Sequence, residues 1–179
     1  MNIPNLITTL RLLLLPVFLT LLVYRLPAAA LAILLVAALS DALDGLIARR
    51  LNQKTAIGSF LDPLADKLLS VSGFVTLAFL GPIPAWFVII VISRDVIVSL
   101  GSLVLYLHDG GLEIAPTLAG KAAMLCQFAT LVLTLVVQLA GAGERAWFWL
   151  LTGTAALTVF SGLQYVWRGL NRAGTKPAA

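Results

Sequence analysis

The sequence predicts an all-α fold, an integral membrane protein with six transmembrane helices. Three observations carry this prediction: 60% of the 179 residues are hydrophobic, only 11% are charged, and the mean hydropathy is +1.02. Soluble proteins have about a quarter charged residues. A soluble domain of this length could not bury so much apolar surface, so we expect the chain to lie in a bilayer. The single cysteine, Cys126, excludes an internal disulfide.

Six apolar stretches approach the roughly 20 residues that a spanning helix needs. In chain order they cover approximately 6–24, 28–50, 61–80, 84–107, 118–140 and 146–167. The breaks between them have turn chemistry: "LP" at 26–27, "GPIP" at 81–84, "HDGG" at 108–111 and "GAG" at 141–143. We therefore expect one membrane domain over residues 1–170, followed by a short cytoplasmic tail over 171–179.

The charges of the loops predict the orientation. One side of the membrane would hold six basic residues, Arg49, Arg50, Lys54, Arg168, Arg172 and Lys176. The other side would hold only Arg25 and Arg145, and Glu144 partly offsets the latter. Because cytoplasmic loops are rich in Lys and Arg, both termini should be cytoplasmic, in a multi-pass protein of the cytoplasmic (inner) membrane. The connection between the second and third helices then lies on the same side.

Four aspartates gather around that connection, in "SDALDGLIARRLNQKTAIGSFLDPLADK" at 40–67. Asp41 and Asp44 are three positions apart and Asp62 and Asp66 are four apart, so each pair shares a helix face, separated by about 60° and about 40°. Helices with a short connection pack antiparallel, which would bring the pairs together at the cytoplasmic edge of the bilayer. Carboxylates this close stay ionised only beside cations, and hard divalent ions share such ligands with substrate phosphates. The pattern predicts a two-metal site for a pyrophosphate, an active site at the cytoplasmic side.

A simpler interpretation makes each aspartate a helix cap or an ion-pair partner. Ser40 and Asp41 could be caps, and Asp62-Pro63 resembles a helix start with proline at the first helical position. Such roles suit single aspartates better than all four, because carboxylates within a membrane are costly and usually functional.

Small residues near the aspartates fit a nucleotide site. Gly45 and Ala48 would leave a bare patch where a base or phosphate approaches the backbone. Arg49 could pair with phosphate oxygens, bidentately if the geometry allows. Gly58 is expected to turn the connection between the two helices. The alternative role for the glycines is helix packing.

These eight positions occur at one fixed spacing, Asp41-x2-Asp44-Gly45-x2-Ala48-Arg49-x8-Gly58-x3-Asp62-x3-Asp66. The spacing resembles the signature of the CDP-alcohol phosphatidyltransferases, with every signature position filled. The six-helix layout extends the resemblance to nearly the whole chain.

The resemblance implies a reaction and roles. Three aspartates would ligate two divalent cations, Mg²⁺ or Mn²⁺, and Asp66 would both ligate metal and act as general base. The CDP pocket would be lined by Gly45, Ala48, Arg49 and Gly58. An acceptor hydroxyl would lose its proton to Asp66 and attack the β-phosphorus of CDP-diacylglycerol, releasing CMP. Family members are often homodimers, so a homodimer is expected here.

Two polar residues, Asn5 and Arg11, lie near the start of the first helix. The resemblance places an Asn-x-x-Thr-type N-terminus beside the CDP site, where Asn5 with Thr8 or Thr9 could serve. The alternatives are helix capping for Asn5 and, for Arg11, a side chain that reaches the membrane interface.

Arg94 and Asp95 in "VISRDVIVS" fall deep in the fourth span, so at least one must face an aqueous cavity or a partner. Because they are adjacent, we expect them to point in different directions, with Arg94 on a phosphate of the acceptor and Asp95 bracing a neighbouring basic residue. Lys121 could join Arg94. The alternative is that both belong to a buried ion-pair network.

The acceptor divides the family. Phosphatidylglycerophosphate synthases, which use glycerol 3-phosphate, usually show a Ser-Arg-Glu segment and a later Leu-Arg pair, but here Asp95 and Ser102 stand at those positions. "ISRD" and "PTLAGKAAMLCQ" look more like cardiolipin synthases, which use phosphatidylglycerol. We place glycerol 3-phosphate first and phosphatidylglycerol second; inositol phosphate, serine and choline remain further possibilities.

Two other classes stay open at this point. A membrane prenyltransferase would also hold a diphosphate through aspartates, but on well-separated helices of a longer chain. A divalent-cation transporter would need polar residues along a path through the membrane, whereas the outer halves of these spans are almost wholly apolar. Nothing in the pattern favours a nucleic-acid partner.

Overall fold

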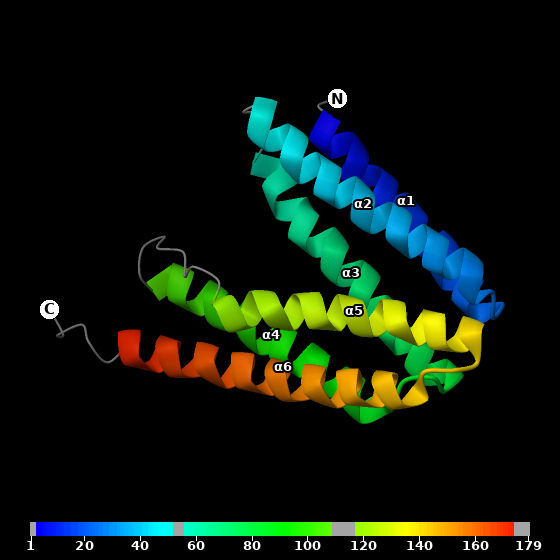
Figure 1. The fold of residues 1–179 in the computed structure, drawn as a ribbon. Coiled ribbons are helices and arrows are strands. Elements are labelled where there is room, and N and C mark those ends of the chain that lie inside the picture. The colour runs from blue at the N-terminus through cyan, green and yellow to red at the C-terminus, as the bar shows by residue number, and fades with distance from the viewer. Residues whose placement is uncertain (1–2, 52–55, 109–116, 174–179) are drawn as a thin grey trace, which may run out of the picture. The chain divides into compact units, whose positions relative to one another are not determined.

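The computed structural model describes the backbone of residues 3–51, 56–108 and 117–173. It describes side chains in 10–40, 67–102 and 117–169 and at Asn171. Throughout the described backbone the regular structure is α-helical, which confirms the all-α prediction (Figure 1). The six helices are α1 (Ile3–Val23), α2 (Pro27–Leu51), α3 (Ala56–Leu80), α4 (Ala85–His108), α5 (Leu118–Ala140) and α6 (Glu144–Ala173).

Three of these helices contain described stretches long and apolar enough to cross a membrane: Ala85–Ser102, Leu118–Ala140 and Glu144–Gly169. The other three helices contain shorter apolar stretches among the described residues: Leu10–Val23, Pro27–Ser40 and Lys67–Leu80. The chain is therefore a membrane-associated protein by the length and composition of its helices.

Two boundaries differ most from the predicted ones. α3 begins at Ala56 and not near 61, so Gly58 lies in its first turn and does not turn the connection. α6 continues to Ala173, beyond the apolar stretch that ends near Trp167. Both helices extend past their apolar parts. The predicted boundaries fell short because hydropathy reports the length of the apolar stretch and not the length of the helix.

The chain forms two compact units, which are described separately. The first consists of Met1–Ile83 with Leu131–Gly143, and the second of Pro84–Thr130 with Glu144–Ala179. The unbroken α5 helix contributes its N-terminal half to the second unit and its C-terminal half to the first.

In the first unit, α1 packs against both α2 and α3 (Figure 1). Phe18 of α1 is completely buried at the contact with α3. A methyl group built on Gly73 of α3 would lie 3.0 Å from Cε1 of Phe18 and 3.5 Å from Cδ1 of Leu131. Glycine at this position therefore sets how closely α1 and α3 approach.

The turn between α1 and α2 closes with paired backbone hydrogen bonds. The N–H of Leu26 donates to the carbonyl of Leu21 at 2.9 Å, and the N–H of Arg25 donates to the carbonyl of Leu22 at 3.0 Å. These two bonds form a Schellman motif, whose C′ residue adopts the left-handed conformation. Here that residue is Arg25, with φ of 54°. Pro27 then begins α2 at the position where a missing N–H costs least.

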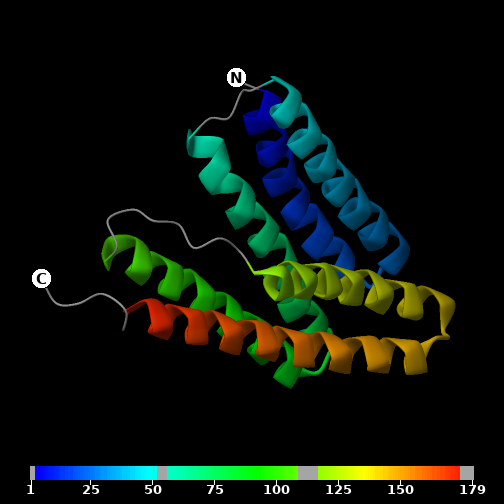
Figure 2. The ribbon, with the colours of Figure 1, turned by 60° about the vertical axis from the view of Figure 1, so that its left-hand side comes forward.

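In the second unit, α4 and α6 run parallel and side by side (Figure 2). Hydroxyl side chains follow one face of α6 and are buried against the neighbouring helices. Thr154 hydrogen-bonds to Thr130 of α5 at 3.0 Å, and Thr158 accepts from Nε2 of Gln127 at 3.1 Å. Hydrogen bonds of this kind, together with van der Waals packing, hold helices together in a bilayer, where the hydrophobic effect gives no net driving force between them.

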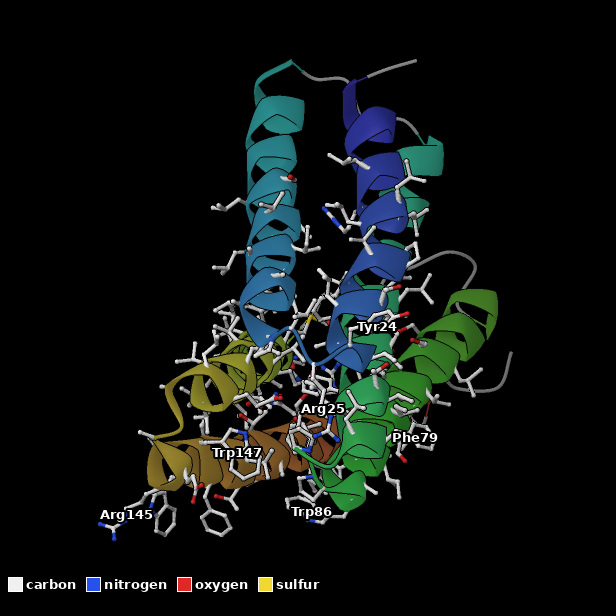
Figure 3. The ribbon with its side chains drawn as sticks, turned by 90° about the vertical axis from the view of Figure 1, so that its right-hand side faces the viewer. Tyr24, Arg25, Phe79, Trp86, Arg145 and Trp147 are labelled. Atoms are coloured by element: carbon white, nitrogen blue, oxygen red, sulfur yellow. The ribbon has the colours of Figure 1, made fainter. Side chains whose placement is uncertain are left out.

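Aromatic and arginine side chains collect at one end of each unit (Figure 3). In the first unit these are Tyr24 and Arg25 in the α1–α2 turn and Phe79 at the end of α3. In the second they are Trp86 at the start of α4 and Arg145 and Trp147 at the start of α6. Exposed aromatic side chains at helix ends are typical of a membrane–water interface.

Candidate active site

The backbone places the aspartates as the spacing predicts, on two helices of the first unit. Asp41 and Asp44 lie within α2, and Asp62 and Asp66 lie within α3. Each pair is about one turn apart on its helix. Their side chains are outside the described residues, as are those of the predicted CDP-binding residues Asn5, Gly45, Ala48, Arg49 and Gly58. The metal, catalytic and CDP assignments therefore stay predictions.

The helix boundaries weaken the capping alternative. α2 ends at Leu51, so Asp41 and Asp44 are interior residues of that helix. α3 starts six residues before Asp62, so Asp62-Pro63 is not a helix start. The hydroxyl of Ser40 donates to the carbonyl of Val36 at 2.8 Å, within the helix. Neither Ser40 nor any of the four aspartates begins a helix.

Arg11 of α1 is buried in the first unit, with 2% of its surface exposed. The alternative in which Arg11 reaches the membrane interface is wrong, because an interfacial arginine keeps its charged head in water. A long cation on the third turn of α1 is instead enclosed by the unit that carries the aspartates.

Among the predicted site residues whose side chains are described, Arg94 lies at the centre of a polar cluster, in the second unit. Arg94 is the tenth residue of α4 and is 5% exposed. Its Nη1 donates to Oδ1 of Asp95 at 2.9 Å. Its Nε and Nη2 both donate to Oγ of Ser161 on α6, at 3.3 and 3.0 Å. A buried guanidinium is thus held on two sides by protein oxygens.

The pairing of Arg94 with Asp95 qualifies the expectation that the two side chains point in different directions. Adjacent residues do leave a helix in different directions, but the arginine side chain is long enough to curl back to the neighbouring carboxylate. The two side chains form an ion pair, with 6% and 14% of their surfaces exposed. Asp95 therefore braces the neighbouring Arg94, and the two form a largely buried ion pair, whereas the acceptor role of Arg94 stays a prediction.

Two glycines make room for the guanidinium. A methyl group on Gly120 of α5 would lie 3.1 Å from Nη2 of Arg94 and 3.1 Å from Oγ1 of Thr117. A methyl group on Gly162 of α6 would lie 3.4 Å from Cγ of Arg94. Thr117 caps α5, since its Oγ1 accepts from the N–H of Gly120 at 2.9 Å. The start of α5 is therefore packed directly against the charged end of Arg94.

Lys121 follows Gly120 on α5, but its side chain is exposed. The structure brings Gly120 rather than Lys121 against the guanidinium, and the acceptor role of Lys121 stays a prediction. Two turns beyond Arg94 on α4, the hydroxyl of Ser102 lies 2.7 Å from the hydroxyl of Tyr165 on α6. The sequence interpretation missed Ser161 and Tyr165. The stripe of hydroxyls on the last span, Thr154, Thr158, Ser161 and Tyr165, was the pattern that could have identified them.

No group of three or more His, Cys, Asp or Glu side chains comes together among those that the structure describes. The four aspartates lie outside that set. Chemically, the described cluster offers a planar cation that can recognise a phosphate oxygen, with one carboxylate beside it that neutralises its charge.

The family model for CDP-alcohol phosphatidyltransferases matches residues 1–160. A Pseudomonas fluorescens protein named CDP-diacylglycerol–glycerol-3-phosphate 3-phosphatidyltransferase is 37% identical over 98% of this chain and 95% of its own length. A Bacillus subtilis protein of the same name is 37% identical over 67% of this chain and 69% of its own. A Mycobacterium tuberculosis protein named "Putative cardiolipin synthase" is 36% identical over 69% of this chain and 59% of its own.

Proposed function

The chain belongs to the CDP-alcohol phosphatidyltransferase family, and we propose from that premise that it moves the phosphatidyl group of CDP-diacylglycerol to the hydroxyl of glycerol 3-phosphate, releasing CMP. The observation that carries the proposal is the family match over residues 1–160, which spans every position of the aspartate pattern. The two relatives named for this reaction support it. Membership of the family leaves the prenyltransferase and cation-transporter hypotheses without support.

We further propose that all six helices span the cytoplasmic (inner) membrane, as one domain over residues 1–170 with a cytoplasmic tail. The excess of Lys and Arg in the loops supports cytoplasmic termini. Within each unit taken by itself, exposed aromatic side chains at helix ends, such as Tyr24 in the first and Trp86 in the second, suit a membrane–water interface. The aspartates would then lie at the cytoplasmic edge, where a water-soluble nucleotide head and a lipid tail can meet.

The donor set of this chain fits two divalent cations. Four carboxylates, paired one turn apart on α2 and α3, provide the hard oxygen ligands that Mg²⁺ and Mn²⁺ prefer. Asp41, Asp44, Asp62 and Asp66 would hold them. When bound, such cations neutralise the charge of the pyrophosphate and of the leaving CMP.

The remaining roles fall to the chain itself. Asp66 accepts the proton of the acceptor hydroxyl, whose oxygen then forms a bond to the β-phosphorus as the bond to CMP breaks. Gly45, Ala48 and Gly58 leave space for the CDP group, and Asn5 and Arg49 bind it. Arg94 binds the phosphate of the acceptor, with Lys121 as a second cation. A second copy of the chain, in a homodimer, completes the proposed assembly.

A second acceptor, phosphatidylglycerol, is favoured by one observation. Asp95 neutralises Arg94, so this ion pair has no net charge. Glycerol 3-phosphate carries a phosphate monoester that is largely dianionic at neutral pH, whereas the phosphodiester of phosphatidylglycerol carries one charge. A lone arginine would attract the dianionic acceptor more strongly than the singly charged one. An ion pair without net charge makes this difference in attraction smaller. Glycerol 3-phosphate stays first because the relatives that cover most of this chain are named for it.

The experiment is a CMP-release assay with purified protein, CDP-diacylglycerol and Mg²⁺ or Mn²⁺. Glycerol 3-phosphate and phosphatidylglycerol are supplied in parallel, beside a reaction without acceptor and one with EDTA. Release that requires both an acceptor and the metal supports the proposal, and the faster acceptor identifies the reaction. If neither acceptor supports turnover, the proposed acceptor class is wrong.

A further inference from the structure

We propose that Ser161 is a positioning residue for the acceptor, acting through the guanidinium of Arg94. The inference rests on the proposed function, because it requires Arg94 to bind the acceptor phosphate. Ser161 lies on α6, 67 positions from Arg94 in the sequence, and is 1% exposed.

The contact is directed at one particular edge of the arginine. Nε and Nη2 form the side edge of the guanidinium fork, and both donate to the single Oγ of Ser161, at 3.3 and 3.0 Å. Nη1 donates to Asp95 at 2.9 Å. Three of the five N–H groups of the guanidinium are therefore committed, to acceptors on two different residues. A guanidinium held at two points cannot rotate about its own axis, so its other two N–H groups point in fixed directions.

Those two N–H groups, one on each terminal nitrogen, have no partner among the described residues. N–H groups on the two terminal nitrogens of an arginine can meet two oxygens of a phosphate. Ser161 thus fixes the orientation of the guanidinium, the group that would touch the ligand. Ser161 itself need not contact the acceptor.

The packing supports a constraint on orientation rather than simple filling of space. Gly120 and Gly162 approach the arginine from α5 and α6, where an added methyl group would lie 3.1 Å from Nη2 and 3.4 Å from Cγ. The arginine has little room to adopt another rotamer. Without the serine hydroxyl, the side edge would lose its acceptor, and only the bond to Asp95 would still orient the guanidinium.

Another buried hydroxyl on the same helix provides a matched control. Thr158 is three residues before Ser161 on α6, is fully buried, and accepts one hydrogen bond from Gln127 of α5 at 3.1 Å. Thr158→Val removes a buried hydrogen bond between helices without touching Arg94. If Ser161 only held helices together, the two substitutions would have similar effects.

The test is steady-state kinetics of the purified protein, with the KM for each acceptor and the KM for CDP-diacylglycerol measured separately. Ser161→Ala is expected to raise the acceptor KM about tenfold, the size expected when a buried charged donor loses its acceptor. The KM for CDP-diacylglycerol should stay within about twofold, since the nucleotide site is on other helices. Ser161→Thr, which keeps the hydroxyl, should have the acceptor KM of the unaltered protein. Thr158→Val should leave the acceptor KM unchanged as well.

Each contrary result has a distinct meaning. An unchanged acceptor KM in Ser161→Ala, or an equal rise in Thr158→Val, overturns the positioning role. Arg94→Gln separates the role of Arg94 from that of Ser161. An acceptor KM that rises in Arg94→Gln but not in Ser161→Ala contradicts only the role of Ser161. No effect in Arg94→Gln contradicts the acceptor role of Arg94 as well. Absence of turnover by the unaltered protein overturns both.

Discussion

Substituting Gly120 by alanine moves the Arg94 guanidinium without removing any polar group from the site. The new Cβ would lie 3.1 Å from Nη2 of Arg94 and 3.1 Å from Oγ1 of Thr117. Unstrained contacts between such atoms lie near 3.5 Å or beyond, so the guanidinium must shift by about 0.4 Å. Oγ of Ser161 is itself only 3.8 Å from the new methyl group, which leaves little freedom for the serine to follow.

The size of the effect follows from the two bonds to Ser161. They measure 3.0 and 3.3 Å, so a shift of about 0.4 Å away from Ser161 takes the longer one beyond hydrogen-bond distance. Losing one buried hydrogen bond from a charged donor costs about 1–2 kcal/mol. If that orientation is what binds the acceptor, the acceptor KM should rise about 5- to 30-fold.

Stability should change much less than binding. Alanine is favoured over glycine inside a helix by about 1 kcal/mol, which offsets strain of similar size at Arg94 and at the Thr117 cap. Gly153→Ala on α6 is the control, because nothing lies within 4 Å of the added methyl group and only the helix-propensity gain remains.

The assay is the acceptor KM in detergent micelles, with the melting temperature of each variant measured beside it. An acceptor KM for Gly120→Ala within about twofold of the unaltered protein, at an unchanged melting temperature, would refute the argument that the position of the guanidinium controls acceptor binding. A rise of the acceptor KM in Gly153→Ala as well would attribute the effect to helix rigidity.

Three further outcomes are expected. Asp66→Asn should lower CMP release by about 10²–10⁴-fold at an unchanged melting temperature, because it removes the proposed general base, and near-normal release would exclude that role. Ser102→Arg replaces the hydroxyl that lies 2.7 Å from Tyr165 by a cation and should shift selectivity toward glycerol 3-phosphate; unchanged selectivity would show that this position does not face the acceptor. Gly73→Ala brings a methyl group to 3.0 Å from the buried ring of Phe18, and the overpacking cost of about 1–3 kcal/mol exceeds the helix-propensity gain. Its melting temperature should fall and should recover when Phe18→Leu is added, whereas no fall would mean that α1 and α3 readjust freely.

The helices were predictable because an apolar stretch and its bounding turn residues are local features of the sequence. The fifth span was predicted with the bounds that α5 has, Leu118–Ala140. The start of α3 was not, because the residues before its apolar stretch are polar enough to read as a connection, although they form helix from Ala56 onward. Hydropathy does not distinguish a polar helical turn from a loop.

The Arg94 cluster shows a different limit. A charged pair in an apolar span is conspicuous, so Arg94 and Asp95 were identified as a site or an ion-pair network from the sequence alone. Their partner was not, because serine is common in spanning helices as a small packing residue and Ser161 is 67 positions away. Which of several hydroxyls on α6 meets the arginine depends on how α4 and α6 pack, and that register is not a local property. The aspartate pattern was recognised for the opposite reason, because all its positions lie within two adjacent helices.

The most direct test of the account follows the phosphorus of the donor. CDP-diacylglycerol carrying ³²P only in the phosphate attached to the diacylglycerol is incubated with the protein, metal and glycerol 3-phosphate, and the lipid and aqueous phases are separated. Attack at the β-phosphorus predicts that the label appears in a new phospholipid that also contains the acceptor glycerol, while the released CMP is unlabelled. Label in the aqueous phase as free phosphate, or label that enters no new phospholipid when acceptor is present, would contradict phosphatidyl transfer by this chain.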